Sequence, residues 1–166
     1  MTPSEGILAK ENPEQREEIV KMLTRAYWME IETVMSYVAA SVNPDGVRAA
    51  EIKESLQNDI ADELGHAQQF AARIKELYGT VPGSEQFEAA QSYLQPPAEP
   101  TDLTSVIKGV IDAERGAIEH YNKIIAACED IDPVTEDMVI AILRDEQGHM
   151  REFEGFLKEY EAEIYR

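Results

Sequence analysis

The chain has 166 residues, of which 43% are hydrophobic, so it can bury a core of its own and fits a single domain over 1–166. Its formal net charge of −18 argues against nucleic acid or an anionic membrane surface as a partner, because both require clustered Lys and Arg. Cys128 is the only cysteine, which excludes an intrachain disulfide and any zinc site built on several cysteines.

The N-terminal segment lacks the apolar core of a signal peptide. No part of the chain approaches the roughly 18 consecutive apolar residues that a membrane span requires. We therefore expect a cytoplasmic protein without a membrane partner.

Four segments carry the apolar spacing of amphipathic helices, and none shows the alternation of a strand. In chain order, helices are predicted at about 13–41, 46–78, 103–128 and 134–160. Turn signals separate the first two and the last two helices, at Asn43-Pro44-Asp45-Gly46 and Asp130-Ile131-Asp132-Pro133. Such short connections make each pair of helices an antiparallel hairpin.

The connection between the two hairpins is longer and rich in proline, over about 81–100. Twenty extended residues span about 60 Å, whereas a helix of some 33 residues is about 50 Å long. The connection can therefore return the chain along the whole bundle. The sequence predicts an all-α fold, a four-helix bundle of two antiparallel hairpins joined by a long crossover.

The string Asp-Glu-x-Gly-His occurs twice, at 62–66 and at 145–149, and contains two of the three histidines. A Glu and a His three residues apart lie on the same face of a helix and can bind one metal ion together. The first copy offers Glu63 with His66, and the second offers Glu146 with His149. The repeated glycine, Gly65 or Gly148, is expected to leave room beside the site.

The helices that precede the two copies supply further candidates, Glu30 and Glu114. The midpoint between each of these residues and the Glu of the following copy falls in the hairpin turn, so both carboxylates of a hairpin stand at one height. Each is also followed seven residues later by a tyrosine, Tyr37 or Tyr121, on the same helix face. Glu32 is an alternative to Glu30 but lies on a different face.

Four carboxylates and two imidazoles form a mixed oxygen and nitrogen ligand set that suits iron or manganese. The sequence therefore predicts a dinuclear metal site with the ligands Glu30, Glu63, His66, Glu114, Glu146 and His149. Asp62 and Asp145 are placed to accept the second ring N–H of the ligand histidines across the bundle. Tyr37 and Tyr121 are either hydrogen-bonded to ligand carboxylates or plain core aromatics.

These motifs resemble the ferritin-like superfamily over all four helices, and the segment 142–149 resembles bacterioferritin most closely. The resemblance implies that the six candidate ligands bind two irons, with Glu63 and Glu146 as bridges. It also implies oxidation of Fe(II) by O₂ or H₂O₂, and many members of the superfamily store the ferric product as a mineral in a hollow shell.

Two departures from bacterioferritin bear on assembly and cofactor. Bacterioferritin binds haem through a Met that follows the ligand Glu of the second helix; here Leu64 occupies that position, so no haem is expected. The short stretch after His149 leaves no room for the fifth helix of 24-subunit cages, so we expect a dimer or a Dps-like dodecamer.

Rubrerythrin is the more distant relative. Its additional ligand Glu on the third helix is replaced by Ala117, and one cysteine cannot form its rubredoxin module. We expect a ferroxidase that serves iron storage, iron detoxification and peroxide defence. The alternatives are a di-iron or di-manganese peroxidase, catalase or oxidase without iron storage, and a non-catalytic assembly subunit in which the metal is structural. The ligand types leave iron and manganese both open.

Overall fold

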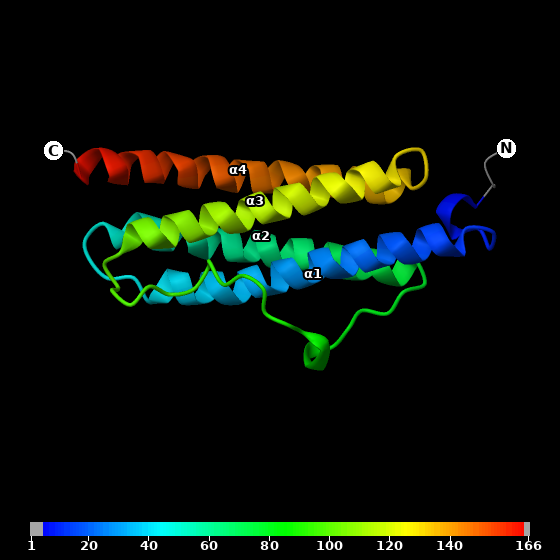
Figure 1. Ribbon diagram of the computed structural model, residues 1–166, viewed down its shortest axis with the longest axis horizontal. Helices are drawn as coiled ribbons and strands as arrows, with labels where there is room; N and C mark the ends of the chain where they lie inside the picture. The colour runs from blue at the N-terminus through cyan, green and yellow to red at the C-terminus, as the bar shows by residue number, and fades with distance from the viewer. Residues whose placement is uncertain (1–4, 165–166) are drawn as a thin grey trace.

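The computed structural model describes residues 5–164, and within this range it contains helices and no strand, which confirms the all-α prediction. Two 3₁₀ turns, Gly6–Leu8 and Ser84–Gln86, accompany four long helices (Figure 1). The long helices are α1 (Pro13–Val42), α2 (Ala49–Glu76), α3 (Leu103–Cys128) and α4 (Pro133–Ile164). None of the described helices is apolar over a length that could cross a membrane.

The bounds of α2 and α4 differ from those predicted. The expected start of α2 at residue 46 is wrong, because Gly46 has a φ of 104°, which is not helical, and the chain turns there. α2 also ends at Glu76, two residues before Tyr78, whose φ of 63° breaks the helix. α4 begins one residue earlier than predicted, at Pro133, because proline fits the first position of a helix.

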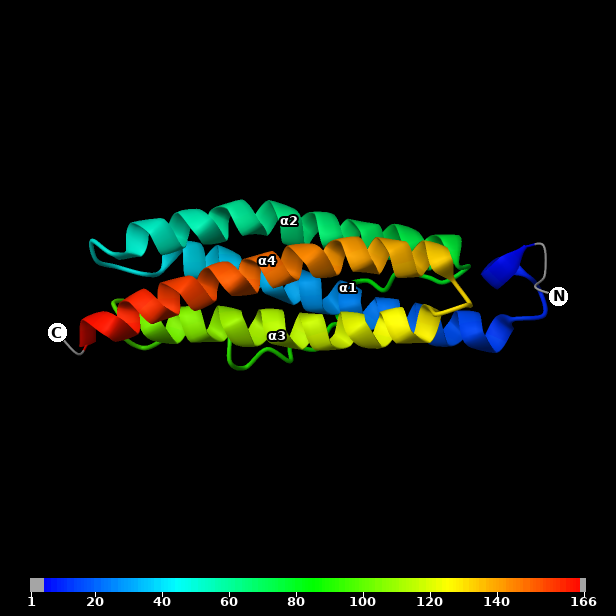
Figure 2. The ribbon, with the colours of Figure 1, turned by 90° about the horizontal axis from the view of Figure 1, so that it is seen from above.

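The long link between the hairpins runs beside α1 and returns the chain from the end of α2 to the start of α3, at the other end of the bundle (Figures 1 and 2). Its backbone is attached to the middle of α1, where Glu32 accepts hydrogen bonds from the amides of Ala90 and Gln91, each at 2.8 Å. At α3 the link passes so close that a Cβ on Gly109 would lie 2.6 Å from the Tyr93 carbonyl oxygen. The crossover is therefore tied to both hairpins.

The hairpins are also joined at one end by a buried polar network. Arg73 of α2 donates to Asp132 at 2.9 Å and to Thr135 at 2.8 Å, and these two residues lie at the start of α4. Asp132 in turn caps α4 by accepting from the Thr135 amide at 3.1 Å. This network fixes the axial position of α4 relative to α2. That axial offset determines which side chains of the two helices face each other at the centre of the bundle.

Two apolar clusters fill the bundle on either side of its centre. The first contains Leu23 of α1, Phe70 of α2, Ile124 of α3 and Ile142 of α4, all essentially inaccessible to solvent. The second contains Tyr37, Leu56, Ile107 and Phe153 from the same four helices in the same order. On every helix the sequence between these two clusters contains the predicted metal ligands. The apolar clusters thus enclose a polar layer and shield it from water.

Candidate metal centre

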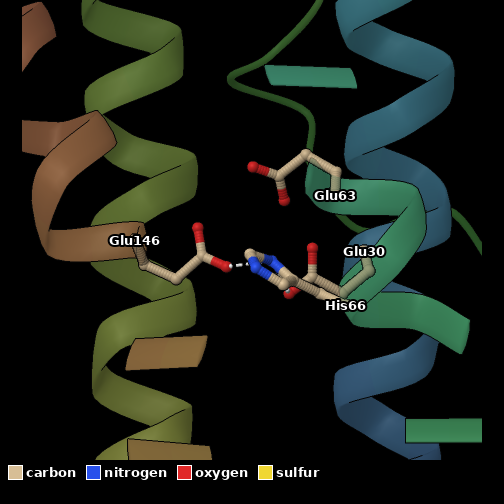
Figure 3. Close-up of side chains that lie close together, drawn as sticks. All are labelled: Glu30, Glu63, His66 and Glu146. Carbon is tan, nitrogen blue, oxygen red and sulfur yellow. Dashed lines mark ion pairs between the residues drawn. The ribbon is translucent and has the colours of Figure 1, made fainter. Parts of the chain in front are cut away.

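The structure brings the six predicted ligand residues together in two overlapping groups. One group is Glu30, Glu63, His66 and Glu146, and the other is Glu63, Glu114, Glu146 and His149. Within each group, one ligand atom from every residue lies within 4.8 Å of the others. Figure 3 shows the first group, with Glu146 of α4 facing His66 and the carboxylates from α1 and α2. Two four-ligand positions therefore share the carboxylates Glu63 and Glu146, as bridging ligands would.

All six side chains are buried. Glu146 is completely inaccessible to solvent, and His149, the most exposed of the six, has 8% of its surface accessible to solvent. Burying a carboxylate costs several kcal/mol unless a cation or hydrogen-bond donors compensate the charge. Four carboxylates against two imidazoles leave an excess of negative charge in this layer, which favours binding of divalent cations.

Several atoms of the layer have no hydrogen-bond partner, and all are potential metal ligands: Glu63 Oε1, His66 Nδ1, both carboxylate oxygens of Glu146, and His149 Nδ1. His66 Nδ1 approaches Glu146 Oε1 to 2.8 Å, yet not with the angles of a hydrogen bond. Buried polar atoms are almost always paired in proteins. Atoms that converge without pairing fit a site built for metal ions, and their chemistry suits iron or manganese.

The two histidines are strongly basic in this setting. Burial alone would lower the pKa of His66, but Glu146, Asp145 and Glu63 outweigh it and raise that pKa to about 9. Burial would likewise lower the pKa of His149. The surrounding carboxylates outweigh this effect and raise the pKa to about 12; they belong to Glu146, Glu63, Glu114 and Asp59. Without a metal, protons on these rings neutralise part of the carboxylate charge. Because a ligand imidazole must be neutral, a metal ion has to displace them.

The carboxylates respond to the same charges in opposite directions. Burial, followed by repulsion from Glu63 and Glu146, raises the pKa values of Glu30 and Glu114 well above normal. Burial also acts to raise the pKa of Glu146, but the close contacts with the imidazole rings of His149 and His66 prevail and lower it to about 2. Glu146 therefore stays ionised, and bound metal ions would compete with protons mainly at Glu30, Glu114 and the two histidines.

The aspartate of each motif copy lies against the histidine of the other copy. His66 Nε2 is 2.9 Å from Asp145, and His149 Nε2 is 3.4 Å from Asp62. These contacts cross between α2 and α4, as the spacing predicts. With Nε2 directed at an aspartate, Nδ1 of each ring is left to face the centre.

Hydrogen bonds from the two tyrosines also connect the two hairpins. Tyr37 of α1 donates to Glu114 of α3 at 2.5 Å, and Tyr121 of α3 donates to Glu30 of α1. Both rings are fully buried. Burial and the neighbouring carboxylates raise the pKa of each hydroxyl well above normal, so both remain protonated donors. Of the two alternatives for these residues, the structure favours hydrogen bonding to the candidate ligands.

Tyr37→Phe and Tyr121→Phe are each expected to weaken Mn²⁺ binding by roughly 10- to 100-fold, because a hydrogen bond to a charged group contributes about 1.5–3 kcal/mol. Calorimetric titration of each variant measures the change. Tyr93→Phe is the matched control, since this tyrosine lies outside the layer and is partly exposed. Unchanged affinity in both variants would assign the two rings to packing alone.

Glu32, the alternative to Glu30, lies outside both groups and anchors the crossover instead. A Cβ on Gly65 or Gly148 would meet no atom within 4 Å, so the space beside both positions is open and packing alone does not require glycine there. The sequence reasoning also missed Asp59, which is buried 3.5 Å from His149 Nε2. Its position one turn before Glu63, on the same face of α2, is the signal that could have revealed it.

Comparison with known proteins agrees with this geometry. Residues 20–162 match the family described as the ferritin-like domain. The DNA protection during starvation protein of Pyrococcus furiosus is 29% identical over 146 residues, covering 85% of this chain and 77% of that protein. Bacterioferritin of Desulfovibrio desulfuricans is 25% identical over 149 residues, covering 89% of this chain and 79% of that protein.

Among solved structures, the dodecameric thioferritin of Bacteroides fragilis, a bacterioferritin-related protein, superposes with a TM-score of 0.84. The two chains are 24% identical, and the superposition covers 95% of this chain and 98% of the thioferritin chain. This similarity supports the fold of the bundle. The family match includes most of each of the four helices and all six candidate ligand residues. The chain belongs to the ferritin-like family.

Proposed function

We propose that this protein is a ferroxidase that binds two Fe(II) ions at the Glu/His centre and oxidises them with O₂ or H₂O₂. The observation that carries the proposal is the pair of four-ligand groups that share Glu63 and Glu146 inside a buried layer. The sharing would hold two ions close enough to deliver two electrons to one oxidant. Membership of the ferritin-like family supports the same conclusion.

Each Fe(II) loses one electron, and H₂O₂ takes up two electrons and two protons to give two waters; O₂ takes the same number to give H₂O₂. The side chains prepare the site for this reaction. Tyr37 and Tyr121 hold the outer carboxylates, Glu114 and Glu30, by donating to one oxygen of each. His66 and His149 release protons as Fe(II) binds, because only neutral rings can be ligands.

One relative is named for DNA protection during starvation. A net charge of −18 opposes contact with DNA phosphates. We therefore propose that any protective effect of this protein comes from removing Fe(II) and peroxide together. A homo-oligomer, either a dimer or a dodecamer as described for the thioferritin, and a cytoplasmic location are part of the same proposal.

The test is to mix the metal-free protein with Fe(II) in air or with H₂O₂ and to follow ferric absorbance by stopped flow. We expect oxidation much faster than in buffer and saturation of the fast phase at about two Fe(II) per chain. Native mass measurement of the product then separates storage from turnover, because a storage assembly retains many irons. Absorbance that rises no faster than in buffer would overturn the proposal, and peroxide consumption without iron oxidation would identify a peroxidase instead.

A further inference from the structure

A small void lies beside the candidate metal ligands, between α1 and α3. Its wall includes the carboxylates of Glu30, Glu63 and Glu114, together with small side chains such as Thr33 of α1 and Ala117 of α3. The volume of the void is about 10 Å³, close to the minimum that holds one water-sized molecule. A small molecule therefore has room directly beside the proposed metal positions.

The crossover covers α1 and α3 next to this void. Glu32 of α1 accepts the backbone amide of Gln91 at 2.8 Å. On the side of α3, a Cβ on Gly116 would lie 3.5 Å from the Tyr93 hydroxyl oxygen, so the crossover is in contact with both helices. Gln91 itself has only 4% of its surface exposed. Its side chain thus lies beneath the crossover, against the helices that form the void.

The side-chain amide of Gln91 is hydrogen-bonded to residues of the void through its nitrogen only. Nε2 donates to the Thr33 hydroxyl at 2.9 Å and approaches the Met29 carbonyl oxygen at 3.5 Å, and both of these residues line the void. The amide oxygen, Oε1, is buried without a hydrogen-bond partner among the described residues.

This unpaired oxygen lies close to the void. The bond lengths of a planar amide keep its oxygen about 2.3 Å from its nitrogen, which places Oε1 within about 5 Å of the Thr33 hydroxyl oxygen. A buried amide oxygen without a partner is costly. A small molecule that donates a hydrogen bond to Gln91 would remove this cost.

The two oxidants of the proposed function differ in this respect. H₂O₂ carries two O–H groups and can donate to the amide oxygen of Gln91, whereas O₂ has no hydrogen to donate. The Thr33 hydroxyl accepts from Gln91 and keeps its own proton, which it can donate to a peroxide oxygen. Together, an unpaired acceptor and a hydroxyl donor complement H₂O₂ better than O₂.

We propose that Gln91 and Thr33 form a hydrogen-bonding subsite for hydrogen peroxide and favour H₂O₂ over O₂ as the oxidant. Gln91 Oε1 accepts from one O–H of the peroxide, and the Thr33 hydroxyl donates to it. Both residues bind the oxidant, and neither is a candidate metal ligand. The preference for one oxidant rests on the proposed ferroxidase function, whereas the binding of peroxide at this subsite requires no oxidation of iron.

The preference is tested by comparing the initial rate of Fe(II) oxidation by H₂O₂ without air with the rate in O₂. In Gln91→Met, which removes the amide and keeps the length of the side chain, the ratio of the two rates should fall by roughly 2- to 13-fold. This range corresponds to the loss of one neutral hydrogen bond of about 0.5–1.5 kcal/mol. The rate with O₂ and the affinity for Mn²⁺ should stay unchanged.

Two sets of control variants make the test specific. Gln86→Met replaces an exposed glutamine of the same crossover and should keep the ratio of the unmodified protein. Thr33→Val, which removes the hydroxyl, should lower the ratio as Gln91→Met does, and Thr33→Ser, which keeps a hydroxyl, should retain it.

Crystals of the full chain provide a readout that does not depend on activity. Zn²⁺ has no redox chemistry, so crystals loaded with Zn²⁺ and soaked in H₂O₂ can hold the oxidant without turnover. We expect peroxide density within hydrogen-bonding distance of Gln91 Oε1 and the Thr33 hydroxyl oxygen. The same soak of Gln91→Met should leave the void without peroxide.

An unchanged ratio in Gln91→Met, or an equal loss of rate with both oxidants, would overturn the peroxide subsite and leave the ferroxidase proposal intact. Failure of the unmodified protein to oxidise Fe(II) with either oxidant would contradict the ferroxidase proposal instead. The crystals then decide the subsite by themselves: peroxide density at Gln91 supports it, and a void that holds only water or nothing overturns it.

Discussion

Replacing Glu63 or Glu146 by alanine is expected to lower the initial rate of Fe(II) oxidation by more than about 100-fold, beyond the loss typical of changes around the ligands. Each of these carboxylates belongs to both four-ligand groups. Its removal would leave both proposed metal positions one ligand short and would take away an oxygen donor that the two ions would share. Stopped-flow absorbance with Fe(II) in air measures the rate.

Two further variants make this prediction specific. Glu114→Ala affects a residue of only one group, so we expect it to weaken one Mn²⁺-binding step in calorimetry and to leave the other. Glu54→Ala changes an exposed residue of α2 and should oxidise Fe(II) as fast as the unmodified protein. If Glu63→Ala and Glu146→Ala oxidised iron at the unmodified rate, the reaction would have to take place elsewhere on the protein.

The second large effect is a dependence of metal binding on pH. At pH 7 without metal, His66 and His149 are both protonated, since their pKa values are about 9 and about 12. Metal binding must displace these protons, and those held by Glu30 and Glu114 where present. We expect the release of about two protons per chain or more. Mn²⁺ titration in buffers of different ionisation enthalpy measures the number.

The same pKa values set the direction of the stability change. The pKa of His66 rises from 6.5 to about 9 on folding, so its proton stabilises the metal-free protein fully below pH 6.5. This contribution is lost as the pH rises to 9. Metal affinity changes in the opposite direction, because fewer protons then compete. The increase in melting temperature that Mn²⁺ produces over a chelator should therefore grow from pH 6 to pH 9; a constant or falling difference would contradict the proposed protonation of the histidines.

The helices and the candidate ligands could be predicted largely from the sequence, because both follow from helical geometry. A Glu and a His three residues apart share a face wherever the helix lies, so Glu63 with His66, and Glu146 with His149, needed no tertiary information. The distance of Glu30 from the hairpin turn indicated its height in the bundle. Metal binding by these residues stays a prediction, while their convergence is a property of the fold.

Helix ends were harder to predict, because single backbone angles decide them. A φ of 104° at Gly46 and of 63° at Tyr78 shorten α2 at both ends, and the apolar spacing continues through both positions. The position of Glu32 against the crossover was equally hidden. Its partners are the backbone amides of Ala90 and Gln91, and amides leave no pattern in a sequence.

The sequence alone thus determined the all-α fold, the two hairpins and the set of acidic and imidazole side chains that face inward. Only the tertiary structure decided how these side chains are paired. Tyr37 meets Glu114 and Tyr121 meets Glu30 across the two hairpins, and Asp59 lies buried against His149. Periodicity within one helix specifies which face is buried; the rotation and axial offset between helices, set by packing and by end contacts such as Arg73 with Asp132, specify which residues touch.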